Sequence, residues 1–157
     1  MGDLHCRSGT VAPICSRLTR RLLPALAAVL LAALNSCAEP AATLGDPALD
    51  AGRETYGRLC STCHGPSGEG VSGPALTDVV ATFPECEDHQ VWVTLGSMEW
   101  ENQFGPIYGA TNKEITAIMP SFKNVLSEAE IAEVASFERF QFGGLSATEA
   151  VAGCGAD

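Results

Sequence analysis

Apolar residues recur at helical spacings in four parts of this chain, and no stretch shows the alternation that predicts a strand. The first helical pattern begins where Asp46 offers an N-cap and Pro47 takes the first helical position. It carries Leu49, Gly52, Tyr56 and Leu59 at helical spacings. These signals predict a first helix that ends close to residue 60.

Two shorter patterns follow in the middle of the chain. Val91 and Leu95 lie four residues apart, and Gly96 follows them, which predicts a helix over residues 87–95. Residues 97–112 read as irregular. A short helix is expected over 113–118, because the proline of Met119-Pro120 disfavours helical geometry in the residue before it.

The last helix has the clearest signals. Ser127 and Glu130 have the spacing of a capping box, which predicts a helix start. The pattern then carries Ile131, Val134 and Phe137 at helical spacings, and Gly143-Gly144 ends it. With no internal repeat and no strand pattern, the fold class predicted is a small all-α domain of three to four helices.

The N-terminal residues differ in kind from the rest. Four arginines precede an apolar run, Leu22 to Leu34, which only Pro24 interrupts. A run of this length is too short to span a bilayer, which takes about 20 residues. A basic segment followed by a short apolar one is typical of a secretory signal peptide, here residues 1–36. The alternative is a buried helix.

The end of this leader, Leu34-Asn35-Ser36-Cys37, resembles a bacterial lipobox. In lipoproteins with that motif the cysteine becomes the N-terminus and is acylated. Two or more acyl chains on Cys37 would anchor the protein stably to a membrane. Cys37 could instead be an ordinary thiol near a standard cleavage site. Residues 37–46 are small and polar, and we expect them to be a flexible tether.

Removal of the leader makes the protein more acidic. The whole chain has a net charge of −10, and the residues from Cys37 onward keep five basic and 18 acidic side chains, a net charge of −13. Nucleic acids and anionic lipids favour lysine and arginine, so neither is expected as a partner. An acidic surface is compatible with docking onto a basic protein, or simply with solubility.

The candidate chemistry is concentrated in Cys60-Ser61-Thr62-Cys63-His64. Two thiols at this spacing can add to the two vinyl groups of one porphyrin, and the adjacent histidine can then bind the iron. The alternatives for a CxxC pair are a redox disulfide or half of a zinc site. The histidine, and the absence of a second CxxC in the sequence, favour one covalently attached haem c.

The remaining cysteines can be sorted by position. Cys6 and Cys15 belong to the leader, and Cys37 is the lipidation candidate. Cys86 and Cys154 are left over, and in an oxidising exported compartment the simplest interpretation is a disulfide. It would close a long loop, add roughly 4 kcal/mol of stability and fasten the tail at residues 144–157. Two independent thiols are the alternative.

Over residues 47–143 the chain resembles a class I monohaem cytochrome c. The marks are Gly52-x-x-x-Tyr56, the Cys60–Gly65 motif, Gly73-Pro74-Ala75-Leu76, Met119-Pro120 and an aromatic C-terminal helix. The resemblance implies that the first and last helices cross at Gly52, with Tyr56, Phe137 and Phe140 packed nearby. It also implies that the carbonyl of Pro74 accepts a hydrogen bond from the ring of His64.

The resemblance also implies a methionine as the second axial ligand. Met119 precedes a proline in a loop, as that ligand usually does, whereas Met98 lacks this context and is expected to be ordinary packing. A core role remains the alternative for Met119. His89 lies among Glu87, Asp88 and Gln90 and is expected at the surface. Three aromatic residues are candidate haem neighbours or core residues: Trp92, Trp100 and Tyr108.

A haem with both axial positions filled moves electrons and leaves no coordination position for a substrate. We therefore expect an electron carrier, not an enzyme, held by a lipid on the outer face of the cell membrane or in the periplasm, with redox proteins as partners. Three alternatives stay open: a haem enzyme or gas sensor with an open iron, a dedicated electron-transfer subunit of an oxidase or dehydrogenase, and a haem-free thiol–disulfide protein.

Overall fold

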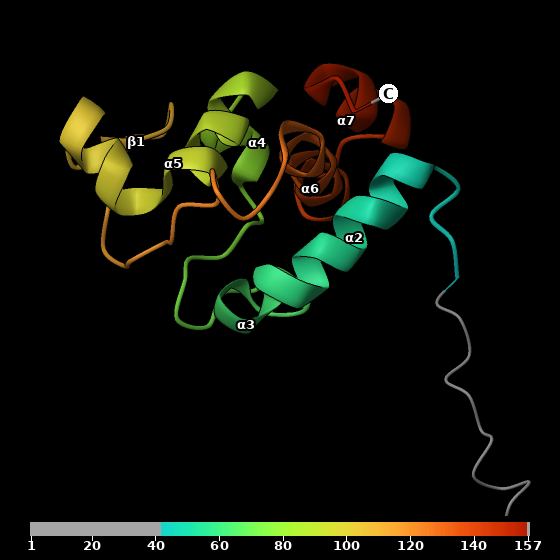
Figure 1. Cartoon of the computed structure of the whole chain (residues 1–157), viewed down its shortest axis with the longest axis horizontal. Coiled ribbons are helices and arrows are strands. Elements are labelled where there is room, and N and C mark those ends of the chain that lie inside the picture. Colours follow the sequence, from blue (N-terminus) through green and yellow to red (C-terminus); the bar gives the residue numbers. More distant parts are fainter. Residues whose placement is uncertain (1–41, 157) are drawn as a thin grey trace, which may run out of the picture. The chain divides into compact units, whose positions relative to one another are not determined.

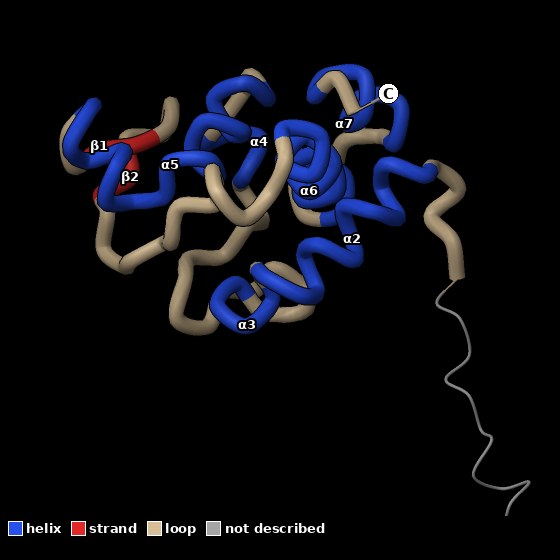
Figure 2. The backbone as a smooth tube through the Cα atoms, in the orientation of Figure 1, coloured by secondary structure: helices blue, strands red, loops and turns tan. Residues whose placement is uncertain are grey.

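The computed structural model describes residues 42–156, which belong to one compact unit. Its helices are α2 (Pro47–Leu59), α3 (Ser61–His64), α4 (Val79–Thr82), α5 (Cys86–Phe104), α6 (Glu128–Gln141) and α7 (Ala147–Cys154) (Figure 1). Strands β1 (Ile107–Tyr108) and β2 (Lys113–Glu114) pair antiparallel (Figure 2). The all-α class is confirmed. The predicted signal peptide and the lipidation candidate Cys37 lie outside the described residues.

Helices α2 and α6 pack against each other, and Gly52 is where they come closest (Figure 1). A Cβ on Gly52 would overlap the Glu133 carbonyl and lie 2.8 Å from the Cβ of Phe137. Tyr56 then packs on Phe137, with ring centroids 5.5 Å apart. Glycine is required here because the two backbones approach too closely for any side chain between them.

Helices α2 and α6 begin as their sequences predict. The Asp46 carboxylate accepts hydrogen bonds from the backbone N–H groups of Ala48 and Leu49 at the start of α2. Ser127 and Glu130 form a complete capping box at the start of α6. The predicted apolar face of α6, with Ile131, Val134 and Phe137, is buried. Phe140 instead packs against a separate cluster that contains Leu49 and Val151.

Two expectations for the middle of the chain are wrong. Gly96 does interrupt the helix, with φ of 64°, but the chain resumes helical geometry at once and α5 continues to Phe104. Its buried face carries Trp92 and Val93, whereas Val91 is 41% exposed. The helix expected over 113–118 does not form, because residues 113–114 pair with β1 instead.

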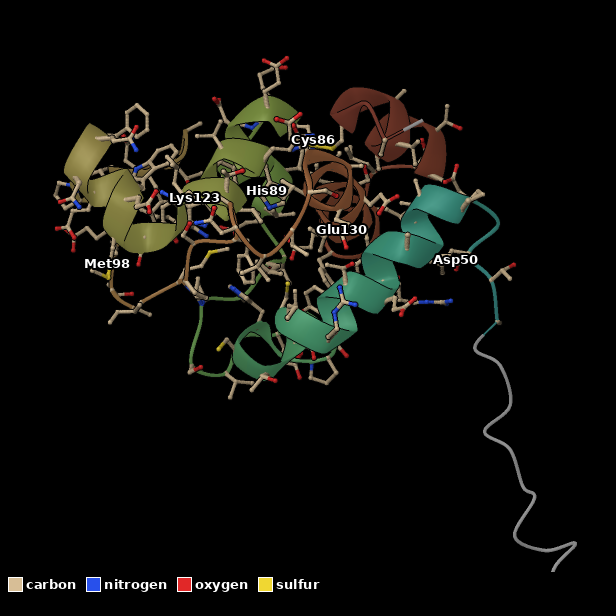
Figure 3. All side chains as sticks on the ribbon, viewed as in Figure 1. Asp50, Cys86, His89, Met98, Lys123 and Glu130 are labelled. Atoms are coloured by element: carbon tan, nitrogen blue, oxygen red, sulfur yellow. A yellow bond between two sulfur atoms is a disulfide. The ribbon has the colours of Figure 1, made fainter. Side chains whose placement is uncertain are left out.

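The segment after α6 carries the additional helix α7, which packs on α6 and contributes Val151 to a cluster with Ala48 and Leu49. A disulfide joins Cys154 of α7 to Cys86 at the start of α5, with Cα atoms 5.2 Å apart (Figure 3). The side-chain amide of Gln90 donates to the Cys154 carbonyl at 2.7 Å. The last helix is thus fastened to the middle of the fold.

Candidate functional site

A cavity of about 350 Å³ collects most of the chemistry-bearing residues predicted from the sequence. Cofactor sites in proteins are mostly apolar clefts of roughly 300–1,000 Å³, and this one falls within that range. Five predicted site residues line it: Cys60, Cys63, His64, Pro74 and Met119. The structure therefore brings together two thiols, an imidazole and a thioether from segments more than 50 residues apart.

The two thiols lie at the one-turn helix α3: Cys63 is within the helix, and Cys60 is the residue that caps its start. Cys60 ends α2 and is the N-cap of α3, so the chain turns sharply within the motif. Cys60 is buried and Cys63 exposed, and neither forms a disulfide. Burial, together with the carboxylate of Glu138 and the neighbouring Cys63, raises the pKa of the Cys60 thiol. Both residues line one cavity, and their thiols are free for covalent attachment.

His64 is oriented by a hydrogen bond to the backbone. Its Nδ1 lies 2.8 Å from the carbonyl oxygen of Pro74. A carbonyl only accepts, so Nδ1 carries the proton and donates, and the lone pair is left on Nε2. A Cβ on Gly73 would lie 3.1 Å from Cε1 of this ring, so the glycine lets the 72–74 backbone pass close to it.

Met119 is held by the residues at the bend of α5. The Ser97 N–H donates to the Met119 carbonyl at 3.0 Å, and the Met119 N–H donates to the Ser97 hydroxyl at 3.0 Å. Gly96 makes this contact possible, since a Cβ there would lie 2.5 Å from the Met119 oxygen. Met98 is 64% exposed and lies on the outer side of α5 (Figure 3).

Aromatic residues form another part of the wall. Trp92 and Tyr108 both line the cavity and stack with centroids 4.2 Å apart. Trp100 does not line it, but packs edge-on against Trp92 and donates to the Ile107 carbonyl at 3.0 Å. Burial, with a smaller contribution from Asp78, raises the pKa of the Tyr108 phenol.

The expectation that His89 lies at the surface is wrong. Its ring is 2% exposed, stacks on Phe83 and lines the cavity. His89 Nε2 lies 3.0 Å from a carboxylate oxygen of Glu138, which also lines the cavity. The polar neighbours of His89 in the sequence concealed the fact that Trp92 and Val93, three and four residues later, place it on the buried face of α5.

The residues present fit a covalently bound haem. Two free thiols and an imidazole with its Nε2 lone pair available line one cavity together with a thioether, and these are the donor types that hold haem in c-type cytochromes. Most of the other lining side chains are apolar or aromatic, as a flat hydrophobic macrocycle requires. Within residues 42–156, no group of three or more His, Cys, Asp or Glu side chains could hold a bare metal ion.

Comparisons with known proteins also point to a cytochrome c. Residues 47–137 match the family described as cytochrome c oxidase, cbb3-type, subunit III. The chain is also 35% identical, over 97 residues, to the cytochrome c subunit of the alcohol dehydrogenase (quinone) of Gluconobacter oxydans (strain 621H). That alignment covers 60% of this chain and 19% of the relative, so the chain spans about one fifth of that subunit's length. No solved structure matches the chain.

The family match covers more than half of the chain and contains the haem motif, Met119 and every residue that lines the cavity except Glu138. Membership of this family implies a covalently bound haem c, and the iron of such a haem exchanges single electrons. The chain therefore belongs to the cbb3-type cytochrome c oxidase subunit III family, as a class I monohaem cytochrome c that carries electrons.

Proposed function

We propose that this cytochrome carries single electrons between redox proteins through a haem whose iron is held by His64 and Met119. The observation that carries the proposal is that both side chains line one cavity with the two thiols of the attachment motif. Two axial protein ligands leave the iron no coordination position for a substrate or a gas. The chain's own contribution is then to bind the cofactor, orient it and exclude water from it.

His64 is the proximal ligand in this proposal. Its hydrogen bond to Pro74 supports the assignment, because it fixes the tautomer that leaves Nε2 free and increases the donor strength of the ring. The same bond restrains the ring orientation, since the proline carbonyl belongs to a segment that packs directly against it. Cys60 and Cys63 would form the two thioether bonds.

Met119 is the distal ligand in this proposal. Its backbone is fixed on both sides by Ser97, and its side chain packs between the aromatic cluster of Trp92 and the core cluster of Tyr56. A thioether ligand raises the reduction potential relative to a second histidine. The exposed Met98 has no comparable support.

We further propose that the protein is exported and anchored by a lipid on Cys37, after removal of residues 1–36. Among residues 42–156, no helix is long and apolar enough to cross a membrane. A tether over residues 37–46 would connect the lipid to the haem-binding part at 47–143, with 144–157 fastened by the disulfide. Such an anchor would keep the carrier near membrane redox complexes.

The partners we propose are redox proteins of a dehydrogenase or oxidase chain. The relative is named as a subunit of a quinone-dependent alcohol dehydrogenase, and the family name refers to an oxidase. A net charge of −13 from Cys37 onward favours a basic docking surface. Electron exchange with a basic redox protein should therefore slow as salt is added, and a rate that rises with salt would contradict this partner class.

The ligand assignment is tested in the haem-loaded protein. Met119→Ala should lower the reduction potential and abolish the weak long-wavelength absorption band that a sulfur ligand gives ferric haem. Met98→Ala is the matched control and should leave both unchanged, since that side chain is mostly solvent-exposed. If the band persists in Met119→Ala, the assignment of Met119 is wrong.

The anchor is tested on the full chain expressed in a bacterial host. Cys37→Ser should release the cytochrome from the membrane fraction or block processing of the leader, and the mass of the wild-type protein should include acyl chains. Unchanged membrane retention of Cys37→Ser would mean that the protein is held in another way.

A further inference from the structure

Helices α5 and α6 place an acid–base pair in the wall of the haem cavity. His89 Nε2 of α5 lies 3.0 Å from Glu138 Oε2 of α6, and the two side chains are only 3% and 6% exposed. Both residues line the cavity. Figure 3 shows His89 on the side of α5 that faces α6. The pair is separate from the four residues that we propose to hold the haem.

The protein does not supply a hydrogen-bond partner for every polar atom of this pair. His89 Nδ1 is fully buried and has no hydrogen-bond partner among residues 42–156. Arg139, the next residue after Glu138, is engaged elsewhere: its guanidinium donates to the carbonyls of Phe83 at 2.6 Å and Pro84 at 2.9 Å. Buried polar atoms are normally paired, so an orphaned ring nitrogen at a cofactor cavity calls for a functional explanation.

The pair has two charge states that differ by one proton. With a neutral imidazole and an ionised carboxylate its net charge is −1, and with an imidazolium its net charge is zero. Reduction of the haem removes one positive charge from the same cavity. In a protein interior, with an effective dielectric constant of about 20, such a change acts on a neighbouring charge far more strongly than in water.

We propose that the His89–Glu138 pair is a proton-binding site coupled to the haem, which takes up a proton when the protein is reduced and releases it on oxidation. The electron comes from the donor protein and the proton from water, and it binds the free nitrogen of His89. Both leave when the acceptor protein takes the electron. This inference rests on the proposed function, because it needs an electron-carrying haem in this cavity.

Other ionisable groups near the pair are less suited to this role. Burial raises the pKa of both Tyr56, on α2, and Tyr108, on β1, so these phenols stay neutral. The Cys60 sulfur is consumed by haem attachment. His64 has its Nδ1 proton committed to Pro74.

The other charged groups nearby are paired, permanently charged or exposed to solvent. Lys113 of β2 forms an ion pair with Asp78, with atoms 2.7 Å apart. Burial lowers the pKa of Arg139 from its very high ordinary value, an effect that Glu85 opposes, and the guanidinium remains charged. Glu87 and Asp88 of α5 are exposed, as is Glu149 at the start of α7. The haem propionates are the competing source of a redox-linked proton.

The test is the reduction potential of the haem-loaded protein as a function of pH. We expect the reduced protein to bind the proton at least tenfold more tightly than the oxidised one, which converts to a fall of about 59 mV for each factor of ten. The potential is measured over roughly pH 5–8, so that the position of the fall can be compared between variants. His89→Gln should abolish the fall, and Glu138→Gln should shift the pH at which the fall occurs. The control Lys123→Gln should leave the fall in place, because Lys123 is solvent-exposed and does not line the cavity.

Proton uptake by the wild-type protein on reduction in weakly buffered solution provides an independent readout. No uptake, or a potential independent of pH, would overturn the proposal. A pH dependence that is retained in His89→Gln would assign the proton to a propionate and also overturn it. If His89→Gln does not incorporate haem, the ring signals of His89 are followed by NMR in the wild-type protein as pH is changed. The coupling predicts that their pH dependence differs between the reduced and the oxidised protein, and the same pH dependence in both would refute it. Failure of the proposed electron-carrier function can be told apart from failure of this inference. In the first case the haem spectrum would be absent or would show an iron with an open coordination position.

Discussion

Ser97 and Met119 hold each other through two backbone-based hydrogen bonds. The Ser97 N–H donates to the Met119 carbonyl, the Met119 N–H donates to the Ser97 hydroxyl, and both distances are 3.0 Å. Ser97 is 2% exposed, so water cannot easily replace these bonds. The bend of α5 at Gly96 therefore positions the loop that carries the proposed distal ligand.

Replacement of Ser97 by alanine should loosen Met119 without affecting haem attachment. The partly buried Met119 N–H loses its acceptor, at a cost of about 1 kcal/mol. The sulfur-to-iron band should then disappear at a lower temperature than in the wild type. Ser121→Ala is the control, because its hydroxyl donates to the Thr94 carbonyl at 2.8 Å and not to Met119. Equal melting of the band in both variants would contradict a positioning role for Ser97.

Gly52 and Gly57 lie on the same helix and should respond oppositely to alanine. A Cβ on Gly52 would overlap the Glu133 carbonyl, which should cost about 1–3 kcal/mol of the free energy of unfolding. Gly57 has no atom within 4 Å of a Cβ, so alanine there should add about 0.5–1 kcal/mol. Denaturant unfolding of the haem-loaded variants measures both. A Gly52→Ala protein as stable as the wild type would mean that α2 and α6 do not cross at this glycine.

Removal of the Cys86–Cys154 disulfide should destabilise the fold. The bond spans 68 positions of sequence, and loss of a cross-link of this size should cost about 2–4 kcal/mol. The measurement compares unfolding of the Cys86→Ala, Cys154→Ala double variant with the wild type. Gln90→Ala leaves the disulfide intact and removes the side-chain amide that donates to the Cys154 carbonyl and to Cys86 Sγ, which should cost about 1 kcal/mol. An unchanged double variant would show that α7 is fastened by packing alone.

The two capping boxes should make stability fall in acid. Hydrogen bonds from Ser127 lower the pKa of Glu130, and hydrogen bonds from Ser146 lower the pKa of Glu149. A folded-state pKa below the unfolded one means that the stabilisation is present above the ordinary pKa of about 4.3 and is lost as pH falls through the lower, folded value.

The Glu130→Gln, Glu149→Gln variant keeps the cap geometry but not the titration. Its unfolding midpoint should therefore depend less on pH in that range than the wild-type midpoint. Glu101→Gln, exposed near the end of α5, serves as the control and should behave as the wild type does. A double variant with the wild-type acid dependence would contradict this account.

Local signals were sufficient for the two helices that cross. Asp46-Pro47 begins α2, and the capping box of Ser127 and Glu130 begins α6, because each signal acts within one turn of the chain. The haem motif also predicted correctly that the protein is a cytochrome c. That inference needs only the fixed spacing of two cysteines and a histidine.

The features that were predicted wrongly depend on contacts between residues that are not neighbours in the sequence. Gly96 interrupts a helix locally, but whether the chain resumes depends on the contact of Ser97 with Met119, 22 residues away. His89 has polar neighbours in sequence, and its partner Glu138 lies 49 positions away along the chain. Residues 113–114 form a strand because they meet residues 107–108. A single sequence states none of these pairings.

The binding of carbon monoxide to the reduced, haem-loaded protein tests the central claim most directly. If His64 and Met119 both hold the iron, the ferric protein should be low-spin, and the ferrous protein should bind carbon monoxide slowly or not at all at neutral pH. Met119→Ala, with one position opened, should bind it rapidly. A high-spin ferric spectrum together with rapid binding by the wild-type protein would show that the iron is open, and that the chain is not a closed electron carrier.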